Sequence, residues 1–172
     1  FLGSSVSGAY GDLDNSDTLF SGLQIFHETD NFYTTGSLFY GKTDTNFKKQ
    51  GLISSLDNFK SSAFSVGLFS KKGFGEYDSF GFQIEQPLRL EEGRMDISIP
   101  VARTKSRVVL FEDYSMDIAP SGRELDLQLI HNWPFSTGII SSRIGFIKEN
   151  NHFSNQKEQF YFSTNIEFRL LK

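Results

Sequence analysis

The chain has 172 residues, a net charge of −4 and no cysteine. This length suits one domain or one small barrel, and the acidic balance argues against a nucleic-acid partner, which would require a basic surface. The lack of cysteine excludes disulfide bonds and thiolate metal sites, and without a run of about 18 apolar residues the sequence predicts no transmembrane helix.

Phenylalanine is unusually frequent. The chain contains 19 Phe residues and is 15% aromatic, yet its mean hydropathy is only −0.32. Aromatic residues favour strands, and no segment shows the 3.6-residue period of a helix. The composition therefore favours an all-β fold.

Alternation of apolar and polar residues predicts ten strands. Most are about 9–12 residues long, close to the roughly 9–11 residues with which a tilted strand crosses a bilayer. In chain order the expected strands are 1–10, 18–27, 32–41, 61–71, 77–88, 94–102, 106–115, 124–133, 138–148 and 159–170. We therefore expect an antiparallel, up-and-down transmembrane β-barrel.

Large apolar side chains occupy one face of these strands, and in a membrane barrel they would face lipid. The predicted lipid-facing residues are Phe80, Phe82, Ile84, Leu125, Leu127, Leu129, Phe162, Ile166 and Phe168. A soluble barrel would turn the same residues inward, so alternation alone does not decide between the two environments.

The placement of charged residues favours the membrane. Charges inside the expected strands have both signs and lie on the polar face, where they could form ion pairs in a lumen. This predicted network comprises Glu85, Asp96, Arg123, Glu124, Asp126, Arg143, Glu167 and Arg169. The lysines fall in expected loops or at strand ends, where they would avoid lipid.

Loop lengths point the same way. Counted from the C-terminal end, the connections 149–158, 134–137, 116–123 and 103–105 alternate between long and short, and 42–60 is a very long loop. Short turns on one side and long loops on the other are typical of outer-membrane barrels. Aromatic residues near the strand ends predict an interface girdle, formed by Trp133, Phe135, Phe160 and Tyr161.

Three segments resemble motifs of one family. Residues 86–93 (QPLRLEEG) resemble its S-x-P-L-R-V-x-x-G segment, 99–103 (IPVAR) resemble its L-P-x-G-R segment, and 119–127 (APSGRELDL) are similar to its L-A-P-S-G-R-E-I-D-L-E-L segment. The family is that of autotransporter translocator barrels attached to subtilisin-like serine peptidases, and the resemblance covers roughly the C-terminal half.

The resemblance implies a function. Residues 1–172 would be the C-terminal part of a longer chain, with twelve strands in the full domain, in the outer membrane of a Gram-negative bacterium. Its partners would be outer-membrane lipid, its own N-terminal passenger, exported by type V secretion, and the barrel-assembly machinery. We expect a monomer that binds no nucleic acid and is not an enzyme, with no catalytic residue, metal or cofactor in this chain.

Two other functions remain open. The first is a free-standing small outer-membrane barrel that acts as a porin-like channel or an adhesin. The second is a soluble β-barrel binding module. Solubility of the refolded chain without detergent would favour the second.

Overall fold

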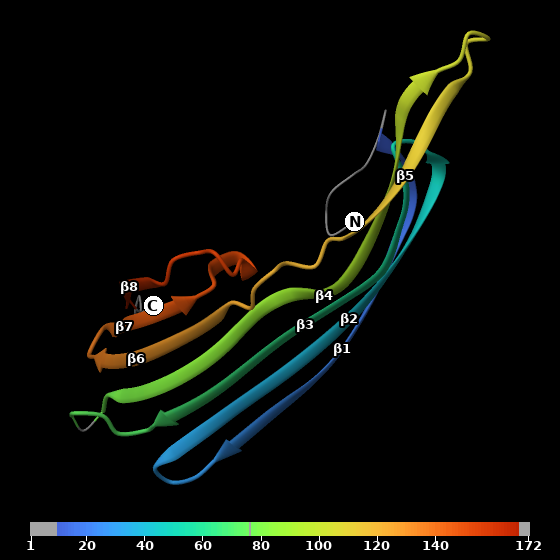
Figure 1. Ribbon diagram of the computed structural model, residues 1–172. Coiled ribbons are helices and arrows are strands. Elements are labelled where there is room, and N and C mark those ends of the chain that lie inside the picture. Colours follow the sequence, from blue (N-terminus) through green and yellow to red (C-terminus); the bar gives the residue numbers. More distant parts are fainter. Residues whose placement is uncertain (1–9, 76, 169–172) are drawn as a thin grey trace. The chain divides into compact units, whose positions relative to one another are not determined.

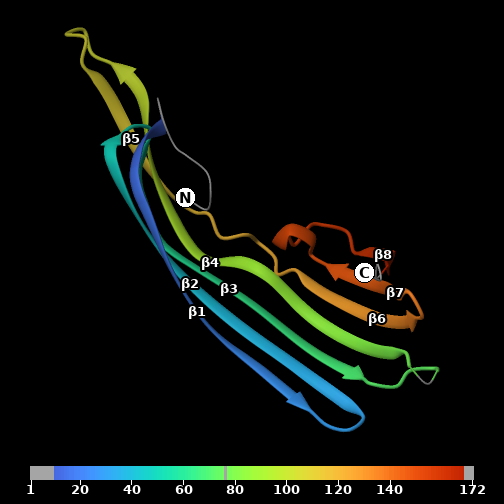
Figure 2. The ribbon, with the colours of Figure 1, turned by 180° about the vertical axis from the view of Figure 1, so that it is seen from behind.

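The computed structural model describes residues 10–75 and 77–168 (Figures 1 and 2). Its regular structure is almost entirely β, which confirms the expected fold class. The elements are β1 (Gly11–Glu28), β2 (Phe32–Gln50), β3 (Ile53–Ser70), β4 (Ser79–Arg103), β5 (Val109–Asp117), β6 (Leu125–Phe135), β7 (Gly138–Lys148), the 3-10 turn η2 (Asn150–His152) and β8 (Gln159–Phe168). In this part of the chain no helix is long and apolar enough to cross a membrane. The expected strand 1–10 lies outside the described residues, except for Tyr10.

The eight strands form one antiparallel sheet. Its order is β1-β2-β3-β4-β6-β7-β8, and β5 pairs with β4 outside this path. Within the described residues, β1 and β8 are therefore the two ends of the sheet. The antiparallel sheet is confirmed, whereas its closure into a barrel remains a prediction.

The expected strands 77–88 and 94–102 are one strand, β4, so the turn predicted at 89–93 is wrong. Its first part, Ser79–Glu85, pairs with β6, and its last part, Arg94–Arg103, pairs with β5. The pairing with β6 ends at Glu85, so Pro87, which has no N–H, can be accommodated beyond it without ending the strand. Consecutive strands β5 and β6 both pair with β4, and the simple up-and-down order is interrupted there.

The very long loop predicted at 42–60 is also wrong. β2 runs to Gln50 and β3 begins at Ile53, so only a two-residue turn separates them. Within β3, Asn58 has a positive φ of 57°, and the buried residues Leu56 and Phe59 lie three positions apart. Such an irregularity is typical of a β-bulge and breaks the period of two. The first part of β3 therefore cannot be recognised from alternation.

These corrections remove two of the arguments for a membrane protein. Lys42 and Lys60 lie inside β2 and β3, not in loops. The N–H of Lys71 donates to the carbonyl of Asn31 at 2.8 Å, so the longer connection 71–78 lies beside the short turn 29–31. Connections are therefore not sorted by length.

The chain divides into two compact units. Unit 1 comprises Phe1–Ser21, Tyr40–Ser61 and Leu90–Ala119, and unit 2 comprises Gly22–Phe39, Ser62–Arg89 and Pro120–Lys172. Strands β1 to β4 contribute residues to both units. The strands β6, β7 and β8 belong to unit 2 alone, and with the first part of β4 they carry most of the predicted site residues.

Candidate membrane-facing surface and polar face

The register of β4, β6, β7 and β8 places the predicted apolar residues on one face. Phe82, Leu129, Ile144 and Phe162 are successive partners across the four strands. Directly opposed residues share a face of an antiparallel sheet, and residues two apart in a strand do as well. The predicted set Phe80, Phe82, Ile84, Leu125, Leu127, Leu129, Phe162, Ile166 and Phe168 therefore forms one surface, here called the apolar face.

The apolar face is exposed, although its side chains are large and hydrophobic. On this face the exposed fraction is 69% for Phe162 and 56% for Ile144, whereas Gln128, on the opposite face of β6, is 8% exposed. Soluble proteins bury large apolar side chains and expose amides. A continuous exposed apolar surface of this kind marks a contact with a membrane or a protein partner.

The opposite face, here called the polar face, carries four of the eight residues of the predicted charged network. Glu85 is directly opposite Asp126, Arg143 lies between Ile130 and Ser163, and Glu167 is opposite Ile139. The predicted member Arg169 lies outside the described residues. These four charges therefore share one face, whereas a lumen around them remains a prediction.

Glu85 and Asp126 do not make the predicted ion pairs within the described residues. Glu85 accepts a hydrogen bond from Gln83 at 3.3 Å, and the buried Oδ1 of Asp126 has no hydrogen-bond partner within the described residues. Two like charges directly opposed across a sheet are unfavourable. Asp96 belongs to unit 1, where it accepts hydrogen bonds from Ser55 at 2.8 Å and Arg94 at 3.3 Å.

Arg123 and Glu124 belong to a different arrangement, at the segment 120–124 that precedes β6. We call this segment the clasp. Arg89 of β4 donates from Nε to the carbonyl of Gly122 and from Nη2 to that of Pro120, both at 2.8 Å. Arg123 donates to the buried amide oxygen of Gln86. A planar guanidinium can hold two carbonyls at once, so Arg89 fixes the path of the chain between β5 and β6.

The loop between β7 and β8 also forms hydrogen bonds with the clasp. His152 accepts the N–H of Glu124 at Nδ1 (2.9 Å) and donates from Nε2 to the carbonyl of Leu88 (3.2 Å). The N–H of Gly122 donates to the carbonyl of His152 at 2.7 Å. A Cβ on Gly122 would lie 2.6 Å from the backbone nitrogen of Ser154, so glycine is required at this contact.

Glu124 therefore has a structural role, because its carboxylate accepts the N–H of Asn151. The carboxylate of Glu149 similarly accepts the N–H of Arg123 at 2.6 Å. Glu149, Asn151 and His152 all have positive φ values, a conformation unfavourable for residues other than glycine. Sequence analysis singled out the segment 119–127 but missed Arg89 and His152 as its partners.

The turn 71–78 forms a second fixed structure at the end of β3 and β4. The buried carboxylate of Asp78 accepts the N–H of Gly75 at 2.7 Å, the N–H of Phe74 at 2.8 Å and Nε2 of His131 at 2.9 Å. The hydrogen bond from His131, with those from the two backbone N–H groups, lowers the pKa of Asp78 to about 2 against the opposing effect of burial. The Phe74 ring lies edge-on to Phe80 at 6.1 Å, so the turn packs against the apolar face.

We expect acid to weaken the hydrogen bonds between the Asp78 carboxylate and this turn. Ionised Asp78 has a pKa below its ordinary value of 3.8, so its stabilising effect is complete above about pH 4 and disappears as the pH falls through about 2. Protection of the Phe74 and Gly75 amides from hydrogen exchange should fall over this range. An Asp78→Asn variant should show weak protection throughout, and unchanged protection of the native chain at pH 1.5 would contradict this prediction.

The four residues of the predicted aromatic girdle do not all lie on one face. Trp133 and Phe135 lie on the apolar face beside the turn 136–137, and Trp133 is 57% exposed. Phe160 lies on the same face. Tyr161 does not, because neighbouring residues of a strand point to opposite faces. It is opposite Gly145, where an added Cβ would lie 2.1 Å from the tyrosine ring.

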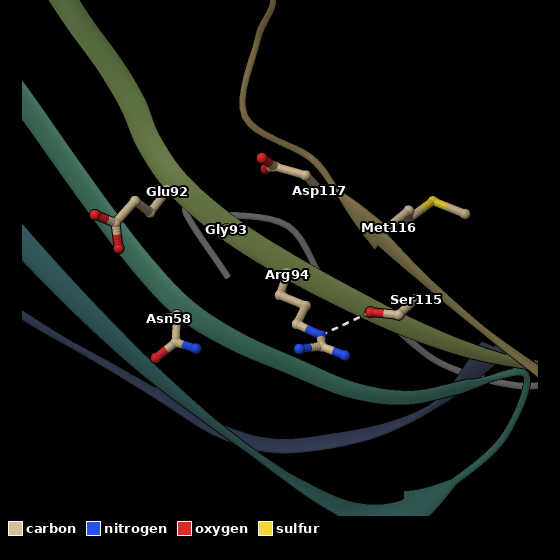
Figure 3. A pocket seen from close by; sticks show the side chains of 7 residues that line it. All are labelled: Asn58, Glu92, Gly93, Arg94, Ser115, Met116 and Asp117. Carbon is tan, nitrogen blue, oxygen red and sulfur yellow. Dashed lines mark hydrogen bonds between the residues drawn. The ribbon is translucent and has the colours of Figure 1, made fainter.

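Unit 1 contains a hollow of about 330 Å³ (Figure 3). Arg94 lines it and donates from Nε to Ser115 Oγ at 2.6 Å, as the dashed line shows. Its Nε also contacts Asp96, and Glu92 and Asp117 line the hollow as well. With one arginine already bonded and two carboxylates present, its chemistry does not select a ligand. Within the described residues, no three His, Asp or Glu side chains are grouped to hold a metal ion.

Comparison with protein-family models, with curated proteins and with solved structures gives no match for this chain.

Proposed function

We propose that this chain is an outer-membrane β-barrel domain of a Gram-negative bacterium that anchors and translocates an N-terminal passenger, as autotransporters do. The observation that carries the proposal is the exposed apolar face of unit 2, on which Phe162, Ile144 and Leu129 are 69%, 56% and 42% exposed. Contact of the apolar face with lipid costs no free energy, whereas its contact with water is unfavourable.

The distribution of lysine supports unit 2 as the part within the bilayer. Its strand residues include one lysine, Lys148, at the end of β7, within the described ranges. The strands of unit 1 contain Lys42 and Lys60, which pair with Asp44 and Glu92. Lysine is costly near the bilayer midplane, so we assign the unit 1 parts of the strands to water.

Strand lengths support the same assignment. β6, β7 and β8 have 11, 11 and 10 residues, which matches the roughly 9–11 residues of a membrane-spanning strand. β4 has 25 residues and is longer than a bilayer requires.

A membrane location also requires closure of the sheet. Unpaired backbone N–H and C=O groups in hydrocarbon cost several kcal/mol each, and β1 and β8 are the ends of the described order. We propose that the outer edges of these strands are paired in the membrane, either with each other or through strands that precede them in a longer chain.

Detergent refolding and gel migration test the membrane barrel. The chain should fold in detergent micelles or lipid vesicles but not in buffer, and the unheated sample should migrate differently from the boiled one because a closed barrel resists dodecyl sulfate. Folding in buffer alone would favour the soluble binding module. Identical migration before and after boiling would contradict closure.

Display of a fused epitope tests translocation. A signal peptide, an epitope and a linker placed before Phe1 in Gram-negative cells should bring the epitope to the cell surface, where added protease removes it from intact cells. An inserted barrel whose epitope stays protected would favour the free-standing channel or adhesin. A translocation-independent control is the same epitope on a known periplasmic protein.

A further inference from the structure

A pocket of about 370 Å³ lies at the turn 71–78 in unit 2. Three aromatic side chains line it, Phe74, Tyr77 and Trp133, together with the hydrogen-bonded pair Asp78 and His131. Phe74 also lies edge-on to His131 at 5.9 Å. The pocket therefore combines π-faces with a buried carboxylate at the border of the apolar face.

The aromatic side chains of this pocket are exposed. Phe74 is 89% exposed and Tyr77 is 74% exposed, although the turn that carries them is fixed by hydrogen bonds to Asp78. The N–H of Gly73 also donates to the Asp78 carbonyl at 2.9 Å. A fixed turn that presents large aromatic rings to the outside is a preformed contact surface.

We propose that this pocket binds the ammonium headgroup of a phospholipid of the phosphatidylethanolamine type. Aromatic faces attract ammonium groups, and the Asp78 carboxylate supplies negative charge behind the rings. Lys72 of the same turn is exposed, and we assign its ammonium to the phosphodiester of the same headgroup. A zwitterionic headgroup satisfies both charges, whereas an anionic one lacks the ammonium. The inference rests on the proposed membrane location.

Trp133 is the single tryptophan of the chain and therefore reports on this pocket. The full chain is refolded into phosphatidylglycerol vesicles, and insertion is first checked by heat-dependent gel migration. Quenching of Trp133 fluorescence is then measured with a minor fraction of brominated phosphatidylethanolamine and, separately, with the same fraction of brominated phosphatidylglycerol. Cation–π contacts predict a preference of about 3- to 30-fold for the ethanolamine lipid.

Variants separate the pocket from general contact with lipid. Phe74→Leu keeps an apolar side chain without the ring and should reduce the preference toward one, whereas Phe153→Leu, an exposed aromatic outside the pocket, should keep it. Equal quenching by the two lipids in the inserted native chain would overturn the site alone. A chain that does not insert, or a Trp133 that neither lipid quenches, would overturn the membrane location and the site together.

Discussion

Phe162→Arg is expected to destabilise the folded chain in lipid vesicles by about 2–4 kcal/mol, the cost of an arginine near the bilayer midplane. Phe162 is 69% exposed and lies on the apolar face opposite Ile144. Asn165→Arg is the matched control, because Asn165 is exposed in the same strand but lies on the polar face opposite Ser141. It should change the free energy of unfolding by less than about 0.5 kcal/mol.

Urea unfolding of both variants in vesicles, followed by Trp133 fluorescence, measures this difference. If the apolar face were in water, arginine at a position as exposed as Phe162 would be tolerated, and both variants would unfold like the native chain. Equal stability of the two variants would therefore exclude lipid contact at β8. The result does not depend on passenger translocation, so it tests location separately from function.

Arg89→Ala is expected to lower the free energy of unfolding by about 3 kcal/mol. The guanidinium makes two charge-assisted hydrogen bonds to the carbonyls of Pro120 and Gly122, and hydrogen bonds to charged groups contribute about 1.5–3 kcal/mol each. Without Arg89 the clasp loses its link to β4. Amide hydrogens of the clasp and of the loop 149–154 should then exchange faster, whereas those of β7 change less.

Arg89→Lys tests whether the forked geometry matters. Lysine keeps the charge but cannot hold two carbonyls in one plane, so its stability should fall between those of the native chain and the alanine variant. Ser121→Ala, which removes only the hydroxyl that accepts from Ser154, should have a much smaller effect. A lysine variant as stable as the native chain would show that charge alone suffices.

The alternation of residues by itself determined the strands of the C-terminal part and their faces. Expected strands 138–148 and 159–170 correspond to β7 (Gly138–Lys148) and β8 (Gln159–Phe168), and 124–133 corresponds to β6. This succeeded because side chains of a strand alternate strictly between two faces, so the apolar residues had to fall together once the strands paired in register.

Only the tertiary structure decided which strands are continuous and what pairs with them. The irregularity at Asn58 shifts the alternation within β3. β4 continues through 89–93 as one strand, with β6 paired to its first part and β5 to its last. The partners Asp78 and His131 lie 53 positions apart, and Arg89 lies more than 30 positions before the carbonyls that it holds. The alternation of residues along a strand shows which face each residue lies on. It does not show which distant segments pair, and these contacts depend on that pairing.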